Sequence, residues 1–125
     1  MTVVAAWTRG PEGWAALLRA AQEATLRGAG LAVLGEVPVE VLARLVAEAG
    51  GVPVTTETVS EGDGRDLASR VIDASYEDEV DLVVVGMRRR SPLGKMLAGD
   101  LAQRILLDAH CSVLAVKPPA GATPS

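Results

Sequence analysis

The chain has 125 residues, of which 49% are hydrophobic and 22% charged, and its net charge is −4. This length is enough for one domain, the composition excludes a disordered chain, and the negative charge excludes the basic field of a typical nucleic-acid-binding protein. Cys111 is the only cysteine, so one chain can form neither a disulfide nor a thiolate metal cluster, and we expect a reducing, cytoplasmic location.

The first half of the chain predicts two strand–helix pairs. Residues 3–7 form a nearly continuous apolar run, which is typical of a strand buried on both faces. Gly10 and Pro11 then open a helix, with Glu12 complementing its N-terminal dipole, and its predicted inner face is Trp14, Leu17, Leu18, Ala21 and Thr25. A second strand over residues 31–37 precedes a helix whose predicted inner face is Val41, Leu42, Leu45, Val46 and Ala49.

The second half continues the alternation. Residues 52–59 alternate in polarity, which favours an edge strand, and residues 82–85 and 113–116 are apolar runs that predict the last two strands. The helix after the third strand has Leu67, Val71, Ala74 and Ser75 on its predicted inner face. The last helix has Leu97, Leu101, Ile105 and Asp108 at the same spacing, and Ala102 and Leu106 widen its apolar side. We assign residues 1–117 to the domain and expect residues 118–125 to be a disordered tail.

Strands that alternate with helices predict an α/β fold with a single open, five-stranded parallel sheet and helices on both faces. Right-handed crossovers favour the strand order 3-2-1-4-5. In such a doubly wound sheet, a ligand binds at the carboxyl ends of the strands where the winding reverses, which is after strands 1 and 4 here.

The connection after the fourth strand is the candidate ligand loop. It is long for this fold class and carries Arg88, Arg89, Arg90 and Lys95 in an otherwise acidic chain. It leads to a helix start at Gly99 and Asp100, whose free amides could hold an anion. The alternative is a solvated basic patch without a ligand.

Several segments also resemble the universal stress protein family. They are the end of the fourth strand with its basic loop, Leu97–Ala98–Gly99, Arg104–Ile105–Leu106, residues 111–116, and more moderately Gly10–Pro11–Glu12 and residues 59–63. The resemblance covers nearly the whole chain and implies a Rossmann-like fold of the adenine nucleotide alpha hydrolase type. The family has ATP-binding and non-binding branches.

The resemblance also implies an ATP motif, and this chain carries a degenerate version of it. Gly86 and Gly99 match its first and last glycines, whereas Arg89 replaces the middle glycine and Asp100 replaces a hydroxyl residue. Thr8 stands where binders usually have Asp. A carboxylate at Asp100 would compete with phosphate for the helix amides, with a nearby arginine compensating its charge. We therefore expect no cofactor, with ATP, and possible Mg²⁺, as the alternative.

The last strand predicts a homodimer. Its residues Val113, Leu114, Ala115 and Val116 form an apolar sheet edge, and the family resemblance implies that two chains pair along it. The candidate ligand residues, taken together, are Thr8, Gly86, Arg88, Arg89, Arg90, Gly99 and Asp100.

Three function classes remain open from the sequence. The first is a non-catalytic stress-response or regulatory module that acts through its dimer and protein partners, the second an adenine-nucleotide sensor, and the third an enzyme of the same fold.

No residue pattern argues for catalysis: neighbouring residues such as His110 and Cys111 usually point apart and are better read as structural. No metal site is expected. No apolar run approaches the roughly 20 residues of a membrane helix, and the N-terminus lacks the pattern of a signal peptide, so we expect no membrane partner.

Overall fold

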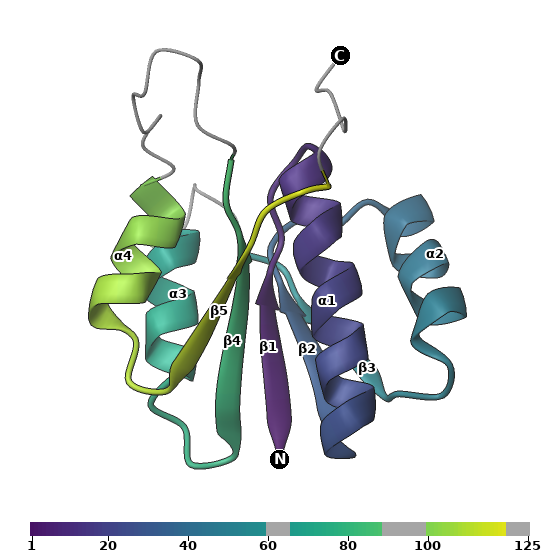
Figure 1. Ribbon diagram of the computed structural model, residues 1–125, viewed down its shortest axis with the longest axis horizontal. Coiled ribbons are helices and arrows are strands. Elements are labelled where there is room, and N and C mark those ends of the chain that lie inside the picture. The colour runs from purple at the N-terminus through teal and green to yellow at the C-terminus, as the bar shows by residue number, and fades with distance from the viewer. Residues whose placement is uncertain (60–65, 89–99, 120–125) are drawn as a thin grey trace.

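A computed structural model describes residues 1–59, 66–88 and 100–119 of the chain. These residues form five strands and four helices that alternate along the sequence (Figure 1). The elements are β1 (Thr2–Ala6), α1 (Pro11–Arg27), β2 (Gly30–Leu34), α2 (Val39–Ala49), β3 (Val54–Glu57), α3 (Leu67–Ala74), β4 (Val80–Gly86), α4 (Asp100–Asp108) and β5 (Ser112–Val116).

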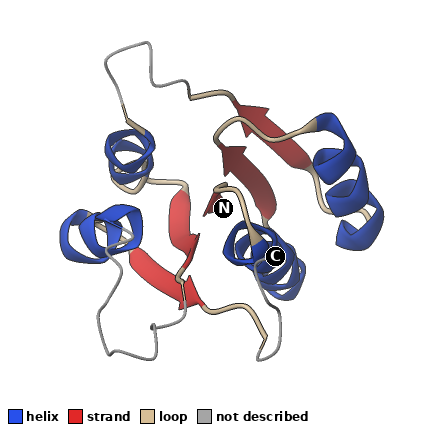
Figure 2. Ribbon diagram, turned by 90° about the horizontal axis from the view of Figure 1, so that it is seen from above, coloured by secondary structure: helices blue, strands red, loops and turns tan. Residues whose placement is uncertain are grey.

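The strands form one parallel sheet in the order β3-β2-β1-β4-β5. Figure 2 shows α1 and α2 on one face of this sheet and α3 and α4 on the other. The predicted fold class, strand order and two-sided layering are therefore confirmed. The winding reverses between β1 and β4, so the carboxyl ends of these two strands meet at one edge of the sheet.

Each face of the sheet has its own aliphatic core. On the α1 side, alternate side chains of β1, β2 and β4 pack with the helix, whose buried residues are Gly13, Ala16, Leu17, Ala20, Ala21 and Ala24. This face differs from the predicted one, because Leu18 is only half-buried and Thr25 is exposed. Small residues let the helix backbone lie close to the sheet, so the run of alanines faces inward in place of the larger side chains.

Two other helix faces are narrower than the sequence predicts. Val46 of α2 is 53% exposed, and of that helix only Leu45 and Ala49 are buried. In α4, Ala102 and Ile105 are buried, whereas Leu106 is 46% exposed. Both helices lie beside the outer strands of the sheet, where fewer neighbours surround them (Figure 2). The strands β2 and β3 are also shorter than predicted, and Pro53, which cannot donate to a ladder, lies just outside β3.

Candidate functional site

The carboxyl ends of β1 and β4 bring together the described part of the predicted ligand site. Thr8 lies two residues after β1, Gly86 is the last residue of β4, and Arg88 follows it by two residues. The first turn of α1 lies between these segments. We call Thr8, Gly10, Glu12, Gly86 and Arg88 the carboxyl-end site.

The first turn of α1 packs directly on the backbone beneath it. A Cβ atom on Gly86 would lie 2.2 Å from the carbonyl oxygen of Glu12, and one on Gly13 would lie 1.6 Å from the carbonyl oxygen of Thr8. Both approaches are possible only without a side chain. Gly86, predicted as a ligand-binding residue, therefore has a structural role that needs no ligand.

Glu12 directs its carboxylate back over Gly10. The side chain of Glu12 is 12% exposed, and its two carboxylate oxygens lie 3.0 and 3.1 Å from the point where Gly10 would carry a Cβ atom. Gly10 has a φ of 100°, which also favours glycine. The Nε atom of Arg88 lies 3.7 Å from Glu12 Oε1, while the Arg88 side chain stays 63% exposed.

The sequence did not reveal this role of Glu12, which it marked only as a partner of the helix dipole. The signal that could have revealed it is the position of an acid directly after the β1 connection, on the helix turn that faces the ligand edge. Arg88 was correctly placed at this edge, but its partner within the described residues is an acid of the protein itself.

Thr8 places a hydroxyl group at the same edge. Its Oγ1 atom is buried and has no hydrogen-bond partner among the described residues. A threonine hydroxyl can both donate and accept a hydrogen bond, whereas the aspartate that the family resemblance implies at this position only accepts when ionised. Among the described residues, the carboxyl-end site thus contains one neutral polar group without a partner and one carboxylate that is already paired.

The rest of the predicted ligand loop lies outside the described residues. This applies to Arg89, Arg90 and Gly99, and to the side chain of Asp100, whose backbone begins α4. The proposed capping by Asp100 and its compensation by an arginine therefore remain predictions.

A second charged cluster joins the start of α3 to α4. Asp66 is the N-cap of α3: its carboxylate accepts a hydrogen bond of 2.8 Å from the backbone N–H of Ser69 and another from the Arg104 guanidinium. Hydrogen bonds to its carboxylate, chiefly from Ser69 and to a smaller extent from Arg104, lower the pKa of Asp66 from 3.8 to about 2. This cluster fixes the two helices to each other and has its polar groups paired.

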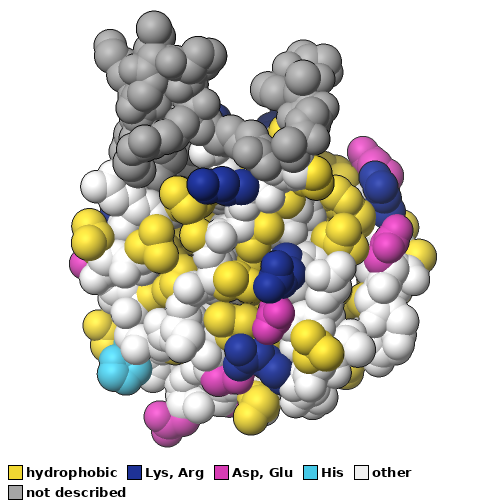
Figure 3. Space-filling view, in the orientation of Figure 1, with side chains coloured by type: hydrophobic (Ala, Val, Ile, Leu, Met, Phe, Trp, Pro, Cys, Tyr) yellow, Lys and Arg dark blue, Asp and Glu magenta, His cyan; other side chains and the backbone are white. Residues whose placement is uncertain are grey.

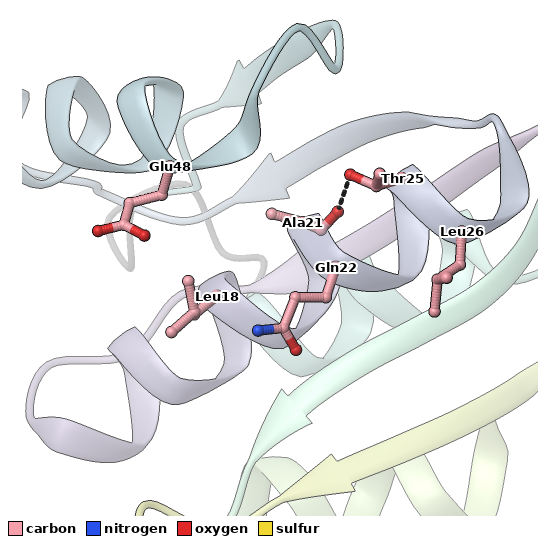
Figure 4. A pocket seen from close by; sticks show the side chains of 6 residues that line it. All are labelled: Leu18, Ala21, Gln22, Thr25, Leu26 and Glu48. Atoms are coloured by element: carbon pink, nitrogen blue, oxygen red, sulfur yellow. Dashed lines mark hydrogen bonds between the residues drawn. The ribbon is translucent and has the colours of Figure 1, made fainter.

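A separate hollow lies on the outside of the molecule, between α1 and α2 (Figure 4). It has a volume of about 450 Å³ and is lined by Leu18, Ala21, Gln22, Thr25, Leu26 and Glu48. The hydroxyl of Thr25 donates a 2.9 Å hydrogen bond to the carbonyl of Ala21, so this group is already satisfied within α1. None of the predicted site residues within the described ranges lines this hollow.

His110 and Cys111 do not form a nucleophile–base pair. The ring of His110 stacks on Tyr76 with centroids 4.8 Å apart, and the backbone N–H of His110 donates to the hydroxyl of the buried Ser75. Burial raises the pKa of the Cys111 thiol, which lowers its thiolate fraction. Among the described residues, no group of three or more His, Cys, Asp or Glu side chains could hold a metal ion.

The predicted dimer residues lie on an outer strand. β5 pairs with β4 on one side, and Val113, Leu114, Ala115 and Val116 are all partly exposed. Leu114 and Val116 pack toward the α1 core, and Val113 and Ala115 toward the α4 core. Within the described part of the chain, no helix is long and apolar enough to cross a membrane.

The fold and the carboxyl-end site define a doubly wound, Rossmann-like α/β domain with its polar groups at the switch point of the sheet. The family model described as the universal stress protein family matches residues 1–117. A universal stress protein from Mycolicibacterium smegmatis is 33% identical, over 93% of this chain and 97% of the relative. The chain therefore belongs to the universal stress protein family.

Solved structures of the family share the fold. A universal stress protein from Archaeoglobus fulgidus has a TM-score of 0.75 and 26% identity, and the match covers 94% of this chain and 98% of that one. A structure of the universal stress protein from Archaeoglobus fulgidus in complex with dAMP has a TM-score of 0.67 and 21% identity, with the same coverage of both chains.

Proposed function

We propose that this protein is a non-catalytic regulatory module of the stress response that acts as a cytoplasmic homodimer and does not bind ATP. The observation that carries the proposal is the carboxylate of Glu12, which is nearly buried in the carboxyl-end site and paired with Arg88. It is a negative charge of the protein itself, at the edge where family binders would receive phosphate.

The Glu12 carboxylate would repel a phosphate group bound at this edge of the sheet. Two unit charges about 4 Å apart repel by roughly 4 kcal/mol at the effective dielectric of a protein surface. A triphosphate carries several negative charges, and the Arg88 guanidinium at this edge already has the Glu12 carboxylate as a partner. The departures of Thr8, Arg89 and Asp100 from the family motif support the same conclusion.

The dimer is proposed to form through β5. A short apolar strand at the edge of a sheet favours pairing with another strand unless it is covered. Figure 3 shows hydrophobic side chains gathered over β5 and its neighbours on this face of the molecule. Protein partners would then recognise the dimer and not the single chain.

The second candidate is an adenine-nucleotide sensor that binds ATP, ADP or AMP, with Mg²⁺ where phosphates require it. The structure from Archaeoglobus fulgidus with dAMP and the retained spacing of Gly86 and Gly99 favour this alternative. The structural role of Gly86 weakens it, because packing against Glu12 alone accounts for that glycine.

Native mass spectrometry of the purified protein tests the proposal in one experiment. We expect the mass of two chains with no bound nucleotide, both as purified and after incubation with Mg-ATP. Thermal-shift measurements with ATP, ADP and AMP provide the comparison in solution, and we expect no shift with ATP. A dimer that retains one adenine nucleotide per chain would instead establish the sensor function.

A further inference from the structure

The outer edge of β5 has backbone groups whose directions follow from the pairing with β4. Within the described residues, β5 lies at the end of the sheet and pairs with β4 alone. The backbone N–H of Met87 donates a 2.8 Å hydrogen bond to the carbonyl of Val116. Because backbone groups alternate in direction along a strand, Leu114 also directs its groups to β4, whereas Val113 and Ala115 direct theirs outward.

A second copy of β5 can use these outward groups in three registers only. Two copies related by a two-fold axis run antiparallel, and hydrogen bonds form where outward-facing residues of both copies meet. Val113 can therefore lie opposite Val113, Val113 opposite Ala115, or Ala115 opposite Ala115 of the second copy. A shift by one residue would place free groups opposite groups that already bond to β4, so it forms no ladder.

The register that pairs Val113 with Ala115 uses the whole strand. β5 spans the five residues Ser112–Val116 and has Leu114 at its centre, so this register alone sets the full strand against its copy. The other two registers pair only residues 112–114 or residues 114–116 of each chain. In the full register Leu114 lies opposite its own copy, in a non-hydrogen-bonded pair, where side chains come closest.

The side chains on both faces of β5 fit this register. Leu114 is half-buried and packs toward the α1 core, so two copies of it would meet on that face. Val113 and Ala115 pack toward the α4 core, so on that face a larger side chain meets a smaller one at two positions. Lys117 of one chain lies opposite the neutral thiol residue Cys111 of the other, and no like charges face each other across the pairing.

We propose that the homodimer forms in this one register, with Leu114 facing Leu114 across the two-fold axis and each Val113 hydrogen-bonded to Ala115 of the second copy. The inference rests on the proposed dimer and goes beyond it, because it fixes which residues of the two chains meet. Leu114 is then the residue that sets the register, since it is the largest side chain of β5 and lies on the axis.

Disulfide cross-linking of single-cysteine variants distinguishes the three registers. Cys111→Ser removes the native thiol, and Leu114→Cys, Val113→Cys or Ala115→Cys is then added to that background. Each variant places its two thiols directly opposite each other in one register only, with Cα atoms about 4.5–5.5 Å apart, as a disulfide requires. In the other registers the two positions are diagonal, about 7–8 Å apart, or farther. Thr56→Cys, at an exposed position of β3 on the opposite edge of the sheet, is the control for chance collisions.

We expect mild oxidation to convert Leu114→Cys to a species of twice the chain mass on a non-reducing gel, and a reducing agent to reverse this. Val113→Cys and Ala115→Cys should cross-link no more than Thr56→Cys. Preferential cross-linking of Val113→Cys or Ala115→Cys would overturn the register and leave the dimer standing. A dimer in which no β5 variant cross-links more than Thr56→Cys would overturn it as well.

A mixed pair of variants keeps the test independent of the Leu114 side chain. Ser112→Cys and Val116→Cys, each in the Cys111→Ser background, are mixed in equal amounts, because the full register alone places these two positions opposite each other. We expect a covalent dimer that contains one chain of each kind, and its absence from a mixture that is dimeric would contradict the register. Light scattering that gives the mass of a single chain for the unmodified protein would instead contradict the proposed dimer itself.

Discussion

Replacing Gly86 by alanine should destabilise the protein strongly, with no ligand present. The added methyl group would lie 2.2 Å from the carbonyl oxygen of Glu12, 2.7 Å from its carbonyl carbon and 3.0 Å from its Cβ atom, well inside the 3.4–4 Å of ordinary contact. The first two atoms belong to the backbone of α1, so no side chain can rotate away. Either α1 or the end of β4 must move.

Forced overpacking of this kind costs about 1–3 kcal/mol, and occasionally more. For a domain of this size, we expect the Tm to fall by roughly 4–12 °C, since each kcal/mol lowers it by about 4 °C. The matched control is Gly30→Ala in β2, where the new methyl group would lie 3.7 Å from the carbonyl of Pro53. Alanine is favoured over glycine within a strand, so this change should be neutral or slightly stabilising.

Urea unfolding of the two variants and the unmodified protein, without added nucleotide, gives the comparison. If Gly86→Ala is as stable as Gly30→Ala, then α1 does not rest on β4 as the structure has it, and the structural explanation of this glycine is wrong. The retained glycine would then again support a ligand-binding role.

Three further predictions concern other parts of the molecule. Asp66→Ala should lower the free energy of unfolding at neutral pH, as measured by urea unfolding. The difference from the unmodified protein should disappear as the pH falls from 3.8 to about 2, because Asp66 stabilises the fold only while its carboxylate is charged. A difference that does not depend on pH would contradict this. Leu114→Lys should shift light scattering toward the monomer mass, whereas Val39→Lys, at a position on α2 that is 80% exposed, should leave the dimer intact; a dimer unchanged by Leu114→Lys argues against β5 pairing. Ser75→Ala should cost about 1–3 kcal/mol in urea unfolding, because it removes the buried acceptor of the His110 N–H; an unchanged free energy of unfolding would show that this hydrogen bond is not needed.

The fold was predictable because its signals are local and repeated. Apolar β-branched runs such as residues 82–85 alternate with helical spacing, and the handedness of crossovers then limits the strand order. Helix faces were less predictable, because the prediction from sequence used hydrophobicity and spacing alone. In α1 the close approach of the backbone to the sheet selects Ala20 and Ala24 over Leu18, and this depends on packing that a single helix does not reveal.

The candidate site was predictable in position and only partly in chemistry. The switch point of the sheet places Thr8, Gly86 and Arg88 at one edge, as topology requires. The role of Glu12 depends on a side chain that folds back over Gly10 and on a distance of 3.7 Å to a residue 76 positions later. The position of Glu12 after the β1 connection indicates the edge of the sheet at which it lies, but sequence spacing does not reveal that Arg88 is its partner.

The central claim is that this member of the universal stress protein family has a carboxyl-end site that does not accept ATP. Calorimetric titration of the unmodified protein with Mg-ATP tests it most directly, at low salt, where electrostatic effects are least screened. We expect no saturable binding at ATP concentrations up to the millimolar range. Stoichiometric binding with a micromolar Kd would contradict it.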